Sequence, residues 1–184
     1  MTRAYIVCGS PGAGKTVYGK KLATRLNATF LDIDVATERL VKLALELAGH
    51  DPDDRDSPFF KEQFREPIYE QLFDIARDNL QHLDVVIAGP FTRELGNPAW
   101  HEQLRERLGS PVEIHYVSCT PEIRRERLAR RGNPRDGAKL RDWEEYLRYY
   151  GDEAPPLCPH ALVDTSGDGC EGIEVPELPG SKFQ

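Results

Sequence analysis

The sequence predicts an α/β protein of three layers, in which a five-stranded parallel sheet lies between two layers of helices. Short apolar runs alternate with longer amphipathic stretches over most of the 184 residues. This alternation is typical of strand–helix–strand units, whose parallel sheets are covered by helices on both faces. The length fits one domain with a hydrophobic core of its own.

The first part of the chain predicts two strands and two helices. The run AYIVC at 4–8 is apolar throughout and predicts a buried strand. The stretch 15–26 has helical periodicity, and 29–32 predicts a second short strand. The stretch 36–48 predicts another helix, because apolar residues recur at helical spacing at Leu40, Leu43, Ala44 and Leu47.

The middle of the chain predicts a loop, an interrupted helix and a strand. Residues 51–58 read DPDDRDSP, and this density of turn-forming residues predicts a loop. Helical periodicity follows over 59–80. Within it, Pro67 must start a new helix or kink a long one, because proline donates no backbone hydrogen bond. The apolar run 85–88 predicts a third strand, which a Gly-Pro pair ends.

The remaining elements complete the alternation. Helices are expected over 98–108, 121–131 and 139–149, with a loop over 132–137, and strands over 112–118 and 161–163. We expect one domain over 1–166 and an irregular tail, rich in Gly, Pro and Glu, over 167–184. Ligands of parallel sheets bind beyond the carboxyl ends of the strands. The site is therefore expected just after Cys8, Asp32, Ala88, Ser118 and Val163.

Charge is distributed unevenly along the chain. The net charge is −7, yet residues 124–141 hold eight basic and two acidic residues, a local charge of +6. The rest of the chain therefore carries −13, which disfavours broad binding to nucleic acid. One basic segment in an acidic body favours a focused anionic ligand instead.

The sequence predicts a cytoplasmic protein with no membrane partner. Its apolar runs are too short to span a bilayer, and its first residues lack the pattern of a signal peptide. The four cysteines form no C-x-x-C pair, and the histidines lack metal-ligand spacing, so we expect reduced cysteines and no zinc site. The sequence contains no signal for the oligomeric state.

The most informative segment is residues 9–16, GSPGAGKT, which matches G-x-x-x-x-G-K-[ST] between a predicted strand and helix. Glycines let the backbone turn N–H groups inward, and a helix N-terminus favours anions. Lys15 predicts a cation for the outer phosphates, and Thr16 predicts a hydroxyl ligand for Mg²⁺. This is the Walker A motif of P-loop NTPases. We expect nucleotide contacts from Gly9, Pro11, Gly12, Ala13, Gly14, Lys15, Thr16 and Val17.

Two carboxylates, Asp32 and Asp34, are expected to close the second strand. Residues two apart in a strand point to the same face, so both side chains are expected where the phosphates lie. One would hold Mg²⁺ through water, and the other would accept a hydrogen bond from an acceptor hydroxyl. The alternative is a helix N-cap and a solvated acid.

The order of strand, Walker A loop, helix and F-L-D-x-D resembles the small-molecule kinases related to shikimate kinase and gluconate kinase. The resemblance implies an adenylate kinase-like P-loop fold. It implies that Asp32 lies near the metal and that Asp34 contacts the acceptor. The helices over about 36–82 would then line the acceptor pocket.

The basic segment carries a second resemblance. CTPEIRRERLARR at 119–131 is similar to the strand and lid helix of adenylate kinase-like enzymes, and R-G-x-x-R-D-x-x-K-x-x-x-W, from residue 131, looks like kinases related to zeta toxin and polynucleotide kinase. The resemblance implies a small lid over about 124–141, with Arg127 near the adenine. Arg131, aided by Arg127 or Arg135, would neutralise charge on the transferring phosphate. The alternative is a solvated basic helix.

Three further residues complete the predicted site. Arg65 begins a helix that resembles the substrate-binding element of these kinases, and Arg93 follows the third strand. Each would bind an anionic group of the acceptor or a phosphate. The alternative is an exposed salt bridge, for example between Arg93 and Glu94. Thr165 follows the fifth strand, in a loop that passes the adenine in adenylate kinase-like folds; a plain turn is the alternative there.

The third strand departs from a common P-loop pattern. Many P-loop proteins end this strand with an acid that holds Mg²⁺, whereas here it runs into Gly89 and Pro90. Asp32 is then expected to take that role, unless Thr16 and water hold the metal. The sequence GPF at 89–91 also differs from the three glycines of shikimate kinase, which disfavours shikimate as the substrate.

These features imply an ATP- and Mg²⁺-dependent kinase that phosphorylates a hydroxyl of a small molecule, with Lys15, Asp32, Asp34 and Arg131 in catalytic roles. The first alternative is a polynucleotide 5′-hydroxyl kinase, which the motifs allow and the acidic body disfavours. The second alternative is a nucleotide-binding switch with little catalysis. No convincing N-K-x-D guanine-reading tetrad is found, which disfavours a GTPase.

Overall fold

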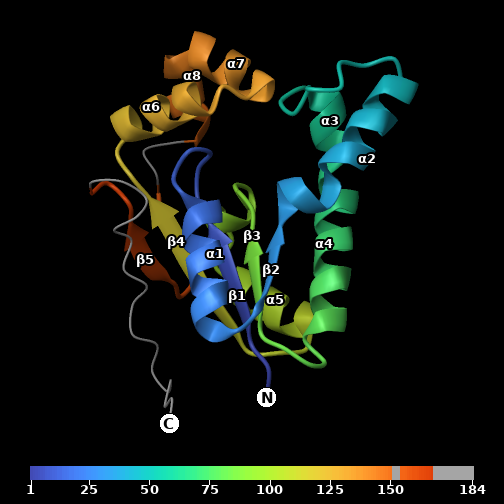
Figure 1. Ribbon diagram of the computed structural model, residues 1–184, viewed down its shortest axis with the longest axis vertical. Helices are drawn as coiled ribbons and strands as arrows, with labels where there is room; N and C mark the ends of the chain where they lie inside the picture. The colour runs from blue at the N-terminus through green and yellow to red at the C-terminus, as the bar shows by residue number, and fades with distance from the viewer. Residues whose placement is uncertain (151–153, 168–184) are drawn as a thin grey trace.

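A computed structural model describes residues 1–150 and 154–167, apart from the side chains of residues 135, 138, 149 and 150. It confirms the predicted three-layer α/β fold (Figure 1). The strands are β1 (Ala4–Cys8), β2 (Thr29–Asp32), β3 (Val85–Ala88), β4 (Val112–Ser118) and β5 (Ala161–Asp164). All neighbours pair in parallel, in the order β2-β3-β1-β4-β5. Most of the predicted tail lies outside the described residues.

Eight α-helices cover or flank the sheet in the described part of the chain. They are α1 (Lys15–Leu26), α2 (Ile33–Leu47), α3 (Pro58–Gln63), α4 (Arg65–Asn79), α5 (Trp100–Leu108), α6 (Pro121–Arg131), α7 (Gly137–Arg141) and α8 (Trp143–Tyr150). Two short 3-10 turns, Glu94–Gly96 and Pro134–Asp136, lie between them. None of these helices is long and apolar enough to cross a membrane.

The alternation of side chains along β1 builds two hydrophobic cores. Ile6 and Cys8 pack on one face against residues of α4 and α5. Tyr5 and Val7 pack on the other face against residues of α1. Because β1 is central and buried along its whole length, its apolar run is continuous instead of alternating with polar residues.

The register of the strands brings their carboxyl ends to one edge of the sheet. Asp32 at the end of β2 lies opposite Ala88 at the end of β3, which in turn pairs with Val7 of β1. The loop that follows β1 therefore begins two strands away from Asp32, at the same level. In Figure 1, this edge faces α6, α7 and α8 on one side and α2 and α3 on the other.

Helix α2 corrects the prediction for the two carboxylates. It begins at Ile33, three residues earlier than expected, because the Asp32 side chain accepts hydrogen bonds from the N–H groups of Asp34 and Val35. Asp34 therefore lies in the first turn of a helix and not at the end of a strand, and the argument from strand alternation was wrong for it.

The leucines that predicted α2 from their spacing are not its buried residues. Val41 and Leu45 are buried, whereas Leu40, Leu43 and Leu47 are 72%, 52% and 81% exposed. Helix α2 packs against α4 and β2. Periodic spacing identified the helix, but the neighbouring elements decided which apolar stripe is covered.

Other helix boundaries are shifted from the predictions. The stretch 59–80 breaks at Phe64 into α3 and α4, which puts Pro67 in the first turn of α4, where no intrahelical N–H bond is required. Helix α5 begins at Trp100, two residues beyond Pro98. The expected loop 132–137 contains a 3-10 turn and the start of α7, and the helix expected over 139–149 is two helices, α7 and α8.

Candidate functional site

Residues 9–16 form a loop between β1 and α1 whose shape depends on glycine. Gly9, Gly12 and Gly14 have φ angles of +135°, +86° and +98°, in the region that side chains disfavour. A Cβ atom at Gly9 would lie 2.1 Å from the carbonyl oxygen of Val117. The loop therefore lies directly against β4, and α1 starts at Lys15 without a side-chain cap. Such a helix start presents N–H groups to an anion.

Lys15 lies inside this loop. Its Nζ atom donates a hydrogen bond to the carbonyl oxygen of Ser10 over 2.8 Å. Burial lowers the pKa of Lys15 to about 8, although the carboxylates of Asp34 and Asp32 act in the opposite direction. The ammonium group of Lys15 is thus held at a position where it would complement the negative charge of a polyphosphate.

Asp32 joins the loop to α2. One carboxylate oxygen accepts a hydrogen bond from the hydroxyl of Thr16 over 2.8 Å, while the other caps α2. Asp32 is only 8% exposed. The N-cap considered as an alternative role for this acid is therefore real, and the same side chain also contacts the predicted metal ligand.

Thr16 and Asp32 form a donor set that fits Mg²⁺. A hydroxyl and a carboxylate are the hard oxygen ligands that Mg²⁺ takes, and this ion commonly uses one or two protein carboxylates with water and phosphate oxygens. No group of three or more His, Cys, Asp or Glu side chains arranged for a metal is found within residues 1–150 and 154–167.

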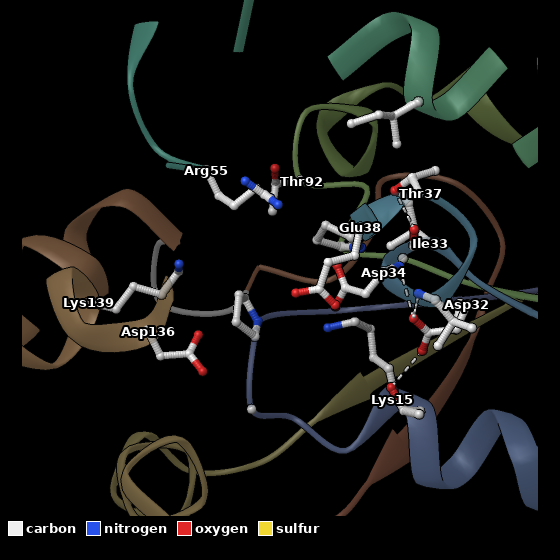
Figure 2. Close-up of a pocket in the computed structure, with 18 of the residues that line it drawn as sticks. Lys15, Asp32, Ile33, Asp34, Thr37, Glu38, Arg55, Thr92, Asp136 and Lys139 are labelled. Atoms are coloured by element: carbon white, nitrogen blue, oxygen red, sulfur yellow. Dashed lines mark hydrogen bonds between the residues drawn. The ribbon is translucent and has the colours of Figure 1, made fainter. Parts of the chain in front are cut away.

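A cavity of about 560 Å³ opens above the loop, between α2, α3 and α4 on one side and α6 and α7 on the other (Figure 2). Most of the predicted site residues line this cavity: Pro11, Gly12, Gly14, Lys15, Thr16, Val17, Asp32, Asp34, Arg65, Arg93, Arg127 and Arg131. The structure therefore brings together residues from five separate segments of the sequence.

Three predicted residues lie behind the cavity wall. Gly9 and Ala13 are buried within the loop. Thr165, after β5, is buried and donates a hydrogen bond from its hydroxyl to the carbonyl of Ala13 over 2.7 Å. Arg127 donates to the Thr165 hydroxyl over 2.9 Å and to its carbonyl oxygen over 2.7 Å. This contact fixes Arg127 beside the loop. The side chain of Arg135 lies outside the described part of the structure.

Two acids of α2 project toward the cavity. Asp34 and Glu38 are one helical turn apart, and Figure 2 shows both pointing to its centre, with Lys15 on the floor. Sequence reasoning considered Glu38 only as a salt-bridge partner for Arg93 and gave it no functional role. The i, i+4 spacing from Asp34 is the signal that would have found it, but only once the helix is known to begin at Ile33.

Arg65 and Arg93 both line the cavity, but they differ in their ion pairing. Arg65 forms an ion pair with Glu94 over 2.7 Å and lies 4.9 Å above the ring of Tyr69. Glu94, which was considered as a salt-bridge partner for Arg93, therefore pairs with Arg65 instead. Arg93 is exposed and forms no ion pair within the described part of the chain.

The turn after β3 positions these groups by an unusual backbone conformation. Phe91 has a φ angle of +49°, although it is not glycine. Its N–H group donates to the hydroxyl of Tyr69 over 3.1 Å, and its buried ring lies 4.9 Å from the Tyr69 ring. These contacts hold the strained residue in place, so Thr92 and Arg93 reach the cavity.

The arginine-rich segment, which we define as α6 to α8, uses its arginines in two ways. Arg127, Arg130 and Arg131 line the cavity. Arg124 is instead almost fully buried, with its guanidinium 5.8 Å from the ring of Tyr146. Arg131 donates to Asp136 over 2.9 Å. The elements that surround α6 thus decide which of its arginines face the cavity and which are buried.

Several cavity residues have no role in the sequence analysis. They are Arg55, Asp56 and Lys61 around the start of α3, Thr92 after β3, and Asp136 and Lys139 in the arginine-rich segment. Asp136 and Lys139 belong to the pattern R-G-x-x-R-D-x-x-K-x-x-x-W of the sequence analysis, which assigned them no role. For Arg55 and Asp56, the only signal is the turn chemistry of the loop that holds them.

The cysteines lie in the core. Cys8, Cys119 and Cys158 are buried, and Cys170 lies outside the described residues. Burial raises the pKa of Cys8, and its thiol lies 3.6 Å from the carbonyl oxygen of His115. A buried neutral thiol is a structural group and not a nucleophile.

Comparison with known proteins identifies a family. Residues 5–153 match the sequence family described as the AAA domain. No curated protein sequence matches the chain significantly.

Solved structures share the fold. A candidate kinase from Chloroflexus aurantiacus J-10-fl is 22% identical, with a TM-score of 0.64, and the match covers 94% of this chain and 92% of that one. A sugar kinase from Janibacter sp. HTCC2649 is 18% identical, with a TM-score of 0.55 and coverage of 90% and 86%. A gluconokinase from Sinorhizobium meliloti 1021 is 16% identical, with a TM-score of 0.55 and coverage of 94% and 86%. These likenesses confirm the predicted three-layer P-loop fold.

Proposed function

We propose that this chain, which belongs to the AAA domain family, is an ATP-dependent kinase that transfers the γ-phosphoryl group to a hydroxyl of a small molecule. The observation that carries the proposal is the meeting of the Walker A loop, the Thr16–Asp32 pair and Asp34 in one cavity. The fold likeness to proteins described as a sugar kinase and a gluconokinase supports the reaction class.

On the donor side, the triphosphate of ATP lies in the loop of residues 9–16. Lys15 exchanges its hydrogen bond with Ser10 for the outer phosphates. Thr16 and Asp32 hold Mg²⁺, which, when bound, neutralises phosphate charge. Arg127 and Arg131 supply further positive charge from the arginine-rich segment, which acts as a lid that excludes water.

On the acceptor side, Asp34 orients the hydroxyl and takes its proton. The hydroxyl oxygen forms a bond to the γ-phosphorus, the bond from that phosphorus to the leaving oxygen of ADP breaks, and the proton passes to the Asp34 carboxylate. Glu38 lies one turn further along α2 and points into the same cavity. It accepts a hydrogen bond from a second polar group of the substrate. Arg93 binds an anionic group of the acceptor, and Arg65 shapes the wall through Glu94 and Tyr69.

The test is transfer of label from γ-labelled ATP with Mg²⁺ to two separate acceptor pools. One pool is a small-metabolite extract and the other contains 5′-hydroxyl oligonucleotides. We expect label in a small molecule, and a loss of about 10²- to 10⁴-fold in Asp34→Asn, since that variant keeps the shape of the side chain and removes its basicity.

Three results would contradict this assignment. Label on the oligonucleotides would identify a polynucleotide kinase. Label in free phosphate alone, or in nothing, would favour a nucleotide-binding switch. Full transfer by Asp34→Asn would remove Asp34 from the role of base, and Glu38→Gln is then the next variant to measure.

A further inference from the structure

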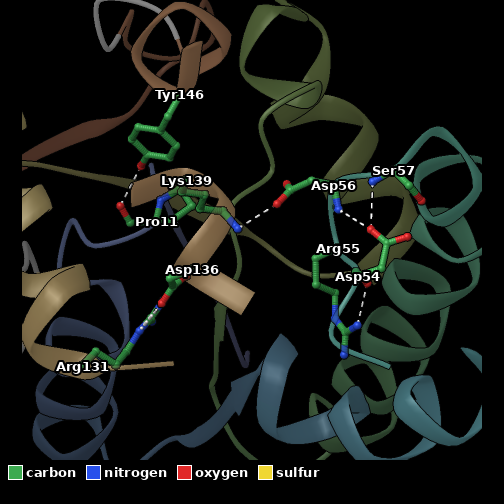
Figure 3. Close-up of polar contacts among 9 residues, drawn as sticks. All are labelled: Pro11, Asp54, Arg55, Asp56, Ser57, Arg131, Asp136, Lys139 and Tyr146. Atoms are coloured by element: carbon green, nitrogen blue, oxygen red, sulfur yellow. Dashed lines mark hydrogen bonds and ion pairs between the residues drawn. The ribbon is translucent and has the colours of Figure 1, made fainter. Parts of the chain in front are cut away.

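The two sides of the cavity meet above the Walker A loop. Residues 51–57, which we call the acceptor loop, form the last part of the connection from α2 to α3 and supply Arg55 and Asp56 to the cavity. Lys139 of α7 donates from Nζ to Oδ2 of Asp56 over 3.0 Å (Figure 3). This ion pair joins elements that are 83 residues apart in the sequence.

The acceptor loop is held together by internal hydrogen bonds. The carboxylate of Asp54 accepts the N–H groups of Asp56 over 3.0 Å and of Ser57 over 2.9 Å. Arg55 donates to the carbonyl oxygens of Pro52 and Asp54. The Ser57 hydroxyl then caps α3. A displacement of Asp56 would therefore also shift the start of α3, to which it is linked through Asp54 and Ser57.

The other end of the bridge is anchored to the Walker A loop. The hydroxyl of Tyr146 on α8 donates to the carbonyl oxygen of Pro11 over 2.9 Å. Asp136, just before α7, is 2% exposed and accepts hydrogen bonds from Arg131 on α6. Helix α7 packs against both α6 and α8. Lys139 therefore projects from a helix whose neighbours contact the nucleotide side of the cavity.

The Lys139–Asp56 ion pair is partly exposed to solvent, which limits its contribution to the free energy. The side chain of Lys139 is 10% exposed and that of Asp56 is 42% exposed. A half-exposed ion pair contributes modestly, about two- to fivefold in an equilibrium. Such a contact is too weak to lock the cavity, but it is strong enough to couple two sides that each hold a ligand.

We infer that the Lys139–Asp56 ion pair couples the nucleotide side of the cavity to its acceptor side, so that nucleotide bound at the Walker A loop orders the acceptor loop. The inference rests on the proposed function, because it needs a nucleotide site. Both are positioning residues, since they act through the elements that carry them. By linkage, an acceptor that orders the loop tightens nucleotide binding by the same factor.

The test is hydrogen exchange of the acceptor loop, measured by mass spectrometry on the full chain with and without ADP and Mg²⁺. In the unchanged protein, we expect nucleotide to slow exchange of the acceptor loop about two- to fivefold. In Lys139→Gln, we expect the slowing to remain around residues 9–16 and to vanish in the acceptor loop.

Two further variants separate coupling from simple loosening. Lys42→Gln removes the 2.9 Å ion pair between Lys42 of α2 and Asp53 and the 3.6 Å ion pair between Lys42 and Glu38. Both pairs lie on the acceptor side of the cavity and do not cross it. We expect faster exchange in its free state, but unchanged slowing by nucleotide. The double variant K139E/D56K reverses both charges and is expected to restore the slowing that each single reversal loses.

Each outcome decides the inference. If calorimetry shows that ADP binds but the acceptor loop is unaffected in the unchanged protein, the coupling does not exist and the nucleotide site still stands. If slowing persists in Lys139→Gln, or the reversed pair fails to restore it, this ion pair is not the link. If no nucleotide binds, the proposed function fails, and the inference fails with it.

Discussion

Lys15 shows how burial tunes one functional side chain. Its ammonium group lies among Ser10, Asp32 and Asp34, and burial lowers its pKa to about 8 despite the two acids. In the free protein, a large fraction of Lys15 is therefore neutral near pH 8. A bound triphosphate favours the charged form and raises the pKa, so nucleotide binding and protonation of Lys15 are linked.

This linkage predicts a pH dependence with a definite sign. ATP affinity should be level below pH 8, where Lys15 is already charged in the free protein, and should fall above it by up to about tenfold per pH unit. At pH 8, binding should take up about half a proton, which calorimetry in buffers of different ionisation enthalpy measures.

Lys15→Arg is the matched control for this prediction, because a guanidinium stays charged throughout the range. It should bind ATP without proton uptake from position 15. Proton uptake that is equal in both proteins would assign the linkage to another group, and affinity that rises above pH 8 would contradict the prediction.

At the scale of elements, helix α2 connects the two halves of the site through its first residues. Asp32 ends β2, caps α2 and accepts the Thr16 hydroxyl. The start of the helix is thereby fixed to the Walker A loop. Asp34 and Glu38 then follow on one face of α2, at distances that the helix determines.

The two roles of Asp32 can be separated by two substitutions. Asp32→Ala should lower the free energy of unfolding by about 1 kcal/mol, because the cap of α2 is lost. Asp32→Asn should stay within about 0.5 kcal/mol of the unchanged protein, since asparagine caps helices as well as aspartate does. Urea unfolding monitored by circular dichroism measures both values.

The same variants test the proposed metal role. Asp32→Asn should require a much higher Mg²⁺ concentration for half-maximal label transfer, because the carboxylate charge is gone while the cap remains. If asparagine destabilises as much as alanine, then Asp32 is not acting as a simple cap. If its Mg²⁺ dependence is unchanged, the metal ligand lies elsewhere.

At the scale of the whole molecule, charge and topology agree on the kind of ligand. The body of the chain is acidic, while the basic segment 124–141 contributes Arg127, Arg130 and Arg131 to the cavity. Positive charge is thus concentrated where phosphates are proposed to lie. Outside that segment, the excess of acidic residues opposes contact with a long polyanion.

This distribution predicts weak binding to nucleic acid. Fluorescence anisotropy with a labelled single-stranded 5′-hydroxyl oligonucleotide should give no saturation at micromolar protein and physiological salt. The control is a fluorescent ATP analogue, which should saturate in the same buffer. Tight oligonucleotide binding that weakens steeply with added salt would contradict the prediction and favour a polynucleotide substrate.

The sequence alone determined the sheet, the Walker A loop and the presence of most helices. These features depend on local patterns: the apolar run of β1, the glycines at 9, 12 and 14, and the periodicity of α1. Their physical causes, namely burial along a strand, backbone freedom and helical spacing, act within a few residues. For the same reason, the strand positions were predicted within one residue.

Only the tertiary structure decided which leucines of α2 are exposed, which arginines of α6 face the cavity, and that Lys139 reaches Asp56. These depend on contacts between segments that are distant in sequence. Arg124 and Arg131 have the same chemistry, yet one packs against Tyr146 and the other faces the cavity, because their neighbours differ. Local patterns cannot contain this information, since it arises when separate elements pack together.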